Sequence, residues 1–200
     1  MVQNAYGYGT RLVKRSFAMK RLYLPLLLCL SLLLSGCGHN KAAARFEEFT
    51  AALSEKELLS FTAELRCEYE DKRMDFTLAY EEDSEGCHVT VAAPELIRGI
   101  RAHAKAGETA VEFDSVVLDT GPLDNYGLSP MSALPVLMDA LRNGYVDSVW
   151  EENGRYAALI VPSDTLNVQI HLDKYTMCPV YAELVSDGRV SVFIHIADWV

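Results

Sequence analysis

The sequence predicts an α+β domain built on a single curled antiparallel β-sheet, with two or three helices on the concave side of that sheet. Three observations favour this class. Roughly nine short segments between residues 61 and 196 have the alternating or apolar pattern of strands, and most are joined by short polar turns. Two segments, 41–59 and 130–143, have apolar residues at helical spacing. These helices interrupt the strand series instead of following every strand, which disfavours a parallel sheet.

Residues 1–36 have the pattern of a secretion signal. Basic residues precede an apolar run of thirteen residues, Leu22 to Leu34, which is shorter than the roughly 20 residues that cross a bilayer as a helix. The run ends in Leu34-Ser35-Gly36-Cys37, which resembles the lipobox of bacterial lipoproteins. That resemblance implies cleavage before Cys37 and a diacylglyceryl group on its thiol. Met19 would open a signal peptide of ordinary length by itself, so it is an alternative start.

The part after the signal is strongly acidic. Residues 37–40 would form a short lipidated tether, and 41–200 are enough for one domain with a sizeable core. Residues 37–200 contain 28 acidic and 13 basic side chains, a formal charge of −15. Such a surface repels phosphate backbones and anionic headgroups, so nucleic acid is not expected as a partner. We expect the lipid on Cys37 to hold the domain at the extracytoplasmic face of the cell membrane without a basic patch.

The first three strands are expected to form a meander with one apolar face. Segments 61–69, 74–80 and 87–93 alternate between apolar and polar residues and are joined by polar turns. A Cys67–Cys87 bridge is disfavoured, because the outer strands of such a meander lie about 10 Å apart. Together with a later strand at 111–118, the meander is expected to place on its apolar face Leu65, Phe76, Leu78, Val89, Val91 and Phe113.

The clearest helix signal spans 130–143. Ser129 is a natural N-cap, Pro130 suits the first helical position and Gly144 follows as the C′ residue. Pro135 should kink this helix. Its apolar side consists of Met131, Leu134, Leu137, Met138 and Leu141.

The order of the elements resembles a known family. An early helix, a meander, the segment Ala93-Pro94-Glu95-Leu96-Ile97-Arg98-Gly99-Ile100, a Leu128-Ser129-Pro130 helix and a closing meander resemble the LolA-type lipoprotein-sorting fold. The resemblance covers nearly all of 41–200 and is nearest to the small clostridial lipoproteins, which include germination lipoproteins. It implies a half-open barrel around an apolar cavity, and the candidate lining residues are Leu65, Phe76, Leu78, Val89, Val91, Phe113, Leu134, Leu137, Met138 and Leu141.

No residue pattern indicates catalysis, a cofactor or a metal centre. Ser129 lies in Gly127-Leu128-Ser129-Pro130-Met131, which lacks the residues of a nucleophile elbow. His171 and Asp173 would share one face of a strand, but no third metal ligand is evident. His88 and His195 are expected to face solvent. We therefore expect no enzyme, no cofactor and no metal ion.

Two functional hypotheses remain open. In the first, the anchored domain is a non-catalytic interaction module for an exported cell-envelope protein, as the resemblance to germination lipoproteins implies. In the second, the half-barrel binds an acyl chain or another apolar ligand. Both need the same apolar interior, so composition does not separate them. The first is preferred, because Cys37 would fix the protein at one membrane and prevent the shuttling of a soluble carrier.

Overall fold

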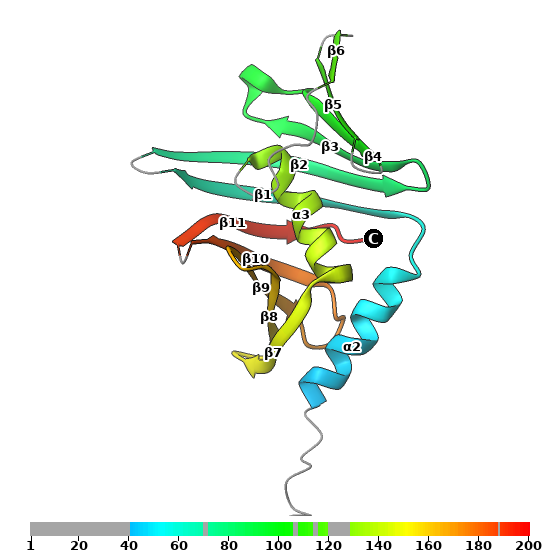
Figure 1. Cartoon of the computed structure of the whole chain (residues 1–200), viewed down its shortest axis with the longest axis vertical. Helices are drawn as coiled ribbons and strands as arrows, with labels where there is room; N and C mark the ends of the chain where they lie inside the picture. The colour runs from blue at the N-terminus through cyan, green and yellow to red at the C-terminus, as the bar shows by residue number, and fades with distance from the viewer. Residues whose placement is uncertain (1–40, 70–71, 106–107, 114–115, 120–128, 188) are drawn as a thin grey trace, which may run out of the picture. The chain divides into compact units, whose positions relative to one another are not determined.

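The computed structural model describes residues 41–69, 72–105, 108–113, 116–119, 129–187 and 189–200. These residues belong to one compact unit, Lys41–Val200. Its strands form a single eleven-stranded antiparallel sheet in the order β6-β5-β4-β3-β2-β1-β11-β10-β9-β8-β7 (Figure 1). The predicted class is therefore confirmed. The predicted signal 1–36, with Met19, and the tether 37–40, with Cys37, lie outside the described residues.

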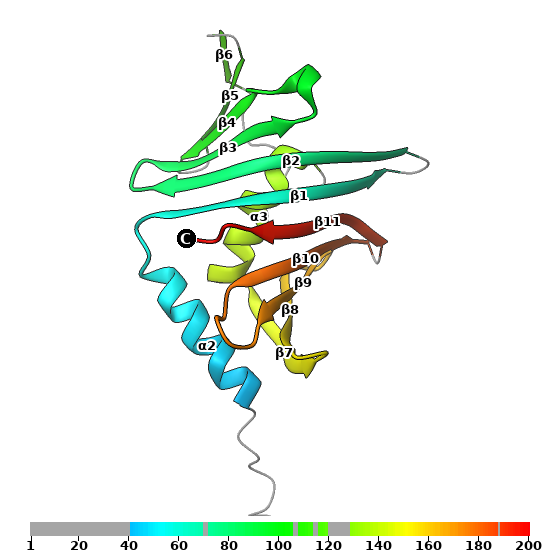
Figure 2. The same ribbon diagram turned by 180° about the vertical axis from the view of Figure 1, so that it is seen from behind.

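The strands fall into two consecutive groups that meet in the middle of the sheet. The first group is β1 Leu59–Tyr69, β2 Lys72–Asp83, β3 Gly86–Ala93, β4 Arg101–Lys105, β5 Glu108–Phe113 and β6 Val116–Asp119. The second group is β7 Tyr145–Glu152, β8 Arg155–Ser163, β9 Leu166–Asp173, β10 Pro179–Ser186 and β11 Arg189–Ala197. Strand β11 pairs with β1, so the earliest and latest strands lie side by side (Figure 2).

Two strands are missing from the prediction of nine. Strand β4 has only alanines, Ala102 and Ala104, between its polar residues. Alanine is a weak apolar marker and is depleted in strands, so the segment carries little strand signal. The single strand expected at 111–118 is instead the pair β5 and β6, which form a short antiparallel hairpin.

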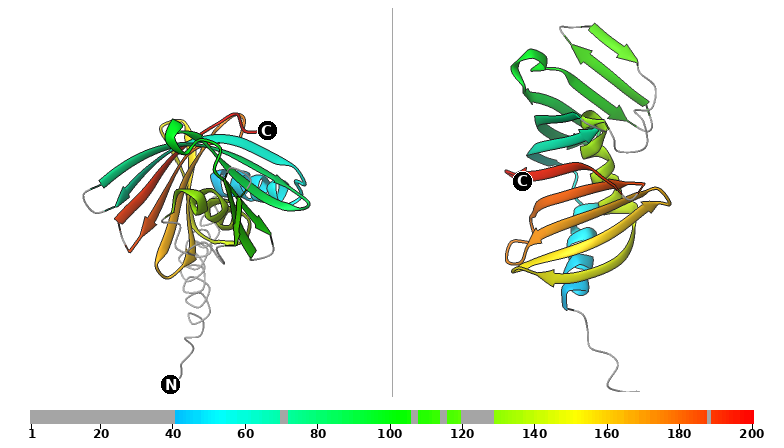
Figure 3. Two further views of the ribbon diagram at one scale, coloured as in Figure 1. Left: turned by 90° about the horizontal axis from the view of Figure 1, so that it is seen from above. Right: turned by 90° about the vertical axis from the view of Figure 1, so that its left-hand side faces the viewer.

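Two α-helices lie on the same side of the sheet, α2 Lys41–Ser54 and α3 Pro130–Asn143, and a 3-10 turn, η1 Glu95–Ile97, follows β3. Seen from above, the strands arch over both helices (Figure 3). Helix α2 ends earlier than the predicted 41–59, because the apolar Leu59 already belongs to β1 and is buried in the sheet. Within the described residues, no helix has the length and apolar character needed to cross a bilayer.

Helix α3 begins as predicted and ends differently. The Ser129 hydroxyl accepts a hydrogen bond from the Met131 backbone N–H at 3.3 Å, and the helix runs on through Pro135. Gly144 has φ −71° and ψ 148°, which is extended rather than left-handed. A Cβ at Gly144 would overlap the Ile160 side chain and the Ala140 carbonyl. The glycine is therefore required for close approach of the helix end to β8.

The core lies between the concave face of the sheet and the two helices. In β1, β9 and β11 alternate residues are buried, as expected for strands with one covered face. Helix α2 contributes Phe46 and Leu53, and helix α3 contributes most of its apolar side. Among the described cysteines, Cys67 is buried, whereas Cys87 and Cys178 are half-buried free thiols.

Candidate functional site

The apolar residues predicted to line a cavity lie together in the packed core. Phe76 is half-buried at the margin of this core, and the side chain of Phe113 lies outside the described part. The structure thus brings the described members together, and their role as the lining of a ligand cavity stays a prediction. Those that are at most 2% exposed are Leu65, Leu78, Val89, Val91, Leu134, Leu137, Met138 and Leu141.

Helix α2 is fastened to the sheet by aromatic rings. The Phe61 ring stacks on the Tyr80 ring with a centroid distance of 4.8 Å and on the Trp199 ring at 5.0 Å. The Trp199 ring contacts Phe49 of α2 at 6.4 Å, and Phe49 contacts Phe46 at 6.0 Å. Aromatic pairs at these separations each contribute about 0.5–1.5 kcal/mol beyond their buried area. The contacts hold α2 against β1 and the residues after β11.

Helix α3 is fastened by a polar cluster at its last turn. Arg142 donates to Glu82 Oε1 at 2.6 Å, and the Tyr80 hydroxyl donates to Glu82 Oε2 at 2.9 Å. The Arg142 and Glu82 side chains are each 21% exposed. Burial raises the pKa of Tyr80 and the pKa of Cys87 beside it. The phenol and the thiol are therefore neutral near pH 7, and the cluster holds α3 to β2 without a reactive thiolate.

The outer face of the sheet, which points away from the helices, presents a row of aromatic and polar side chains. Directly opposed residues of antiparallel strands share a face, and the register aligns His171, Tyr181 and His195 across β9, β10 and β11. The Tyr181 ring lies 5.7 Å from the His171 ring and 4.9 Å from the His195 ring, between centroids. The Tyr181 hydroxyl donates to Glu183 at 2.6 Å, and burial raises the pKa of Tyr181.

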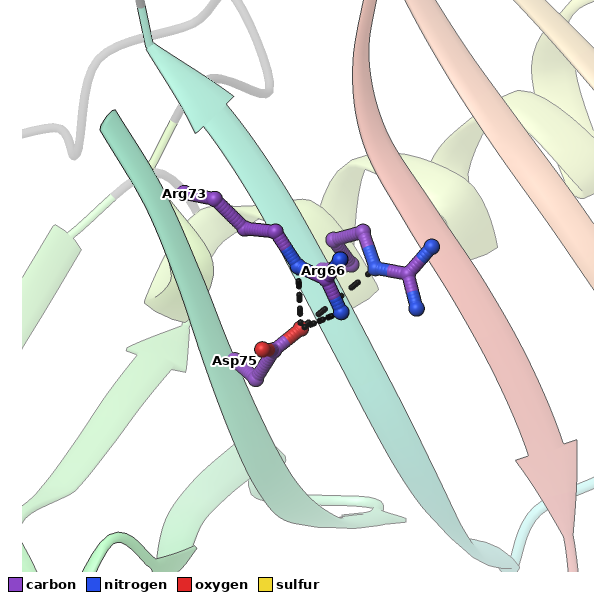
Figure 4. A network of polar contacts seen from close by, with 3 residues as sticks. All are labelled: Arg66, Arg73 and Asp75. Carbon is purple, nitrogen blue, oxygen red and sulfur yellow. Dashed lines mark hydrogen bonds and ion pairs between the residues drawn. The ribbon is translucent and has the colours of Figure 1, made fainter. Parts of the chain in front are cut away.

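Next to this row, the outer face contains a pocket of about 390 Å³ between β11, β1, β2 and the start of η1. At its edge, two arginines converge on one carboxylate oxygen of Asp75 (Figure 4). The Arg66 Nε lies 3.5 Å from this oxygen, and Arg73 donates to it from Nε and Nη2 at 3.3 Å. The lining residues are Glu64, Leu65, Arg66, Arg73, Asp75, Phe76, Thr77, Ala93, Pro94, Phe193 and His195.

This pocket offers both charge signs and an aromatic ring to a bound group. Figure 4 shows the terminal nitrogens of Arg66 pointing away from Asp75, and Arg66 is one of the residues that line the pocket. A guanidinium in this position can hold a carboxylate through two parallel hydrogen bonds. Phe193 is the cross-strand neighbour of Arg66 and supplies apolar contact beside it. This combination of arginine and aromatic residues is typical of protein–protein hot spots.

A second pocket, of about 470 Å³, lies at the opposite end of β1 and β2. Leu58 and Val200 contribute exposed apolar surface there, at 70% and 71% exposure. Its acidic lining comes from the end of β2. The remaining lining residues are Lys56, Leu59, Ser60, Glu81, Glu82, Asp83 and His88.

The polar residues weighed from the sequence have other roles. Asp173 accepts hydrogen bonds from the backbone N–H groups of Tyr175 and Thr176, which lower its pKa and close the β9–β10 turn. His195 is exposed as expected. His88 lies on the outer face of the sheet and is half-buried there, where it pairs with His103. Within the described ranges, no group of three or more His, Cys, Asp or Glu side chains is arranged to hold a metal ion.

The outer-face pocket was not predicted from the sequence. Arg66 and Asp75 occupy the polar positions of alternating strands, which ordinarily indicate only a solvent-facing side. Phe193 reaches them from a strand more than a hundred residues later, through the β1–β11 pairing. The one available signal was Phe193 itself, an aromatic residue on the polar side of its strand.

Comparison with known proteins gives similarity at the level of the fold. No protein-family model matches the sequence, and no curated protein matches it. Solved structures similar to it include a LolA superfamily protein from Nitrosomonas europaea, at 13% identity, 79% coverage of this chain, 92% of that chain and a TM-score of 0.46.

Two other solved structures similar to this chain are an outer membrane lipoprotein-sorting protein domain and a lipoprotein complex. The first is a putative domain from Vibrio parahaemolyticus, at 12% identity, 78% and 90% coverage and a TM-score of 0.46. The second is the CwlD amidase from Clostridioides difficile in complex with the GerS lipoprotein, at 14% identity, 74% and 88% coverage and a TM-score of 0.38.

Proposed function

We propose that this chain is a membrane-anchored, non-catalytic interaction module that binds an exported protein of the cell envelope through the outer face of its sheet. The observation that carries the proposal is the contrast between the two faces. The concave face is covered by α2 and α3, and its apolar side chains pack in one core. The outer face presents half-buried aromatic rings, two arginines and a pocket of about 390 Å³.

The charge of the chain favours a partner with a basic surface, and the arginines of the pocket favour one carboxylate within that surface. With a formal charge of −15 after the predicted cleavage site, the domain attracts a basic protein over a distance and accelerates the encounter. Arg66 and Arg73 are an exception to this acidic surface. A carboxylate of the partner that reaches the pocket would pair with Arg66, and this contact would fix the orientation of the complex.

The anchor is the second part of the proposal. A lipid on Cys37 would hold the domain, through the short tether 37–40, on the extracytoplasmic face of the membrane. A tether of four residues spans at most about 14 Å. The module would therefore keep its partner close to the membrane surface.

Site-specific photo-crosslinking of the full-length chain in cells tests the proposal. A photoreactive residue at Thr77, in the pocket, is compared with one at Thr50, on α2. We expect a protein adduct of one discrete mass from Thr77, none from Thr50, and loss of the Thr77 adduct when Arg66→Ala is added. Equal adducts from both positions, or an adduct that survives Arg66→Ala, would contradict the outer-face site.

An apolar ligand in the concave side is the alternative outcome. The apolar side of α3 includes Met138, whose flexible side chain suits an adaptable apolar surface. Native mass spectrometry of the protein separates the two functions. The lipid-binding function would be favoured over the interaction module if stoichiometric lipid were bound inside the domain. This lipid should be lost in Leu137→Glu without unfolding of the domain.

A further inference from the structure

A second pair of histidines, His88 and His103, lies where strands β4, β5 and β6 join the rest of the sheet. Strand β4 pairs with β3 through only four residue pairs, Cys87↔Ala104, His88↔His103, Val89↔Ala102 and Thr90↔Arg101. By comparison, β1 and β2 pair through eleven residues of each strand. Two backbone hydrogen bonds of Val91, with Gly99 and Ile100, extend this short ladder. The histidine pair lies within the ladder, on the outer face of the sheet.

The two imidazole rings face each other with their Nδ1 atoms 3.1 Å apart. Their centroids are 4.3 Å apart and the ring planes are inclined by 31°, so the nitrogen edges are the closest parts of the rings. A Zn²⁺ ion binds imidazole nitrogen at about 2.0–2.1 Å, which places two such ligands about 2.9 Å apart at a right angle and about 3.3 Å apart in a tetrahedron. The observed separation lies between these two values.

Charges of both signs surround the pair. Glu81 is opposite His88 in the β2–β3 register and shares its face. Its carboxylate is 3.3 Å from Arg101 Nη2. Arg101 disfavours positive charge on His88, whereas Asp83 and Glu81 oppose this effect. Burial and the neighbouring His103 lower the pKa of His88, so its imidazole is neutral near pH 7, as a metal ligand must be.

We propose that His88 and His103 form a two-histidine site for a divalent transition metal ion, with water in the remaining positions, and that the ion fastens β4 to β3. Imidazole suits Zn²⁺, Ni²⁺ and Cu²⁺. Two protein ligands make this site weaker than a four-ligand structural zinc site. Its effect is local, because it joins two strands that otherwise share only four residue pairs.

Titration of the purified full-length protein with Zn²⁺ and with Ni²⁺, followed by calorimetry, tests the site. We expect one equivalent of metal to bind, and His88→Gln or His103→Gln to weaken binding at least tenfold. His195→Gln is the matched control, since it removes an exposed histidine from the same face of the sheet without touching the pair. Cys87→Ser tests the adjacent thiol, which is half-buried beside Tyr80 on the concave face. Both controls should bind metal as the wild type does.

Two measurements keep the test valid if a histidine variant folds poorly. X-ray absorption of the zinc-loaded wild type should show nitrogen and oxygen neighbours, and zinc should protect the amides of β4 from hydrogen exchange. Sulfur neighbours, unchanged exchange in β4, or equal weakening by His195→Gln would overturn the site. In that event the pair is a hydrogen bond between the two imidazoles. The result is independent of the crosslinking test, because the pair lies outside the pocket at Arg66.

Discussion

Replacing Gly144 by alanine tests the contact between the end of α3 and β8. Gly144 has a negative φ of −71°, which every residue adopts easily. At such a position Gly→Ala usually stabilises a protein by about 0.4–1 kcal/mol, because the unfolded chain loses freedom. Here the added Cβ would overlap the Ile160 Cγ2 atom and the Ala140 carbonyl oxygen. Packing and chain entropy therefore predict opposite signs.

Packing should win. Forcing one carbon into a well-packed site costs about 1–3 kcal/mol, and Ile160 and Ala140 are at most 1% exposed, so neither has free space to move into. Subtracting the entropic gain leaves a cost of about 0–2.6 kcal/mol. Because the added Cβ would overlap Ile160 Cγ2 and would lie 2.5 Å from the Ala140 oxygen, we expect the middle to upper part of that range, about 1–2 kcal/mol. In a domain of this size, that corresponds to a fall of about 2–8 °C in Tm.

Urea denaturation of four proteins provides the assay: wild type, Gly144→Ala, Ile160→Ala and the double variant. Ile160→Ala alone should cost about 2–5 kcal/mol, and in its background Gly144→Ala should cost less, because one of the two overlaps is gone. Gly154→Ala is the control, since Gly154 has φ +76° and nothing within 4 Å of its added Cβ. Its cost should be the same in both backgrounds. A Gly144→Ala variant as stable as the wild type would refute the reasoning.

Three further outcomes are expected. Leu78→Ala removes a side chain that is fully buried and should lower the free energy of unfolding by about 2–5 kcal/mol, measured by urea denaturation. Cys37→Ala should leave a full-length, unlipidated precursor in membrane fractions, and mass spectrometry that found a correctly trimmed protein would contradict the lipobox. Burial lowers the pKa of His171 below 6.5, although Glu152 and Glu183 oppose this shift, so protonation favours the unfolded chain. The contribution of His171 to stability should be fully present above about pH 6.5 and should be lost as the pH falls below that value. In thermal unfolding measured at several pH values, His171→Gln should reduce this pH dependence.

The sequence was informative where a residue's local pattern decides its structure. Alternation located β1 to β3, and the Ser129 hydroxyl, Pro130 and the spacing of the apolar side of α3 located that helix. Strand β4 was missed, since Ala102 and Ala104 carry little apolar signal. The end of α2 was misplaced, because Leu59 fits the helical stripe and the strand equally well.

The candidate sites depended on contacts that no local pattern specifies. Arg66 meets Asp75 across a hairpin, and Phe193 joins them only because β11 inserts beside β1. His88 meets His103 through the pairing of β3 with the unrecognised strand β4. Both groups are made of residues that, taken one strand at a time, are ordinary members of a polar face. Strand order determines them, and strand order is a property of the whole chain.

The central place of β11 has a consequence for how the domain folds. Residues 62–67 of β1 bond to residues 192–197 at the other end of the domain, so the middle of the sheet forms from the most distant segments in sequence. Contacts of such large separation slow folding, because loop closure is unfavourable until they form. The growing chain therefore holds β1 without its second neighbour until β11 has been made. For a chain exported by the proposed signal, this delay would be useful, since the sheet could not be completed while the last strand was still inside the cell.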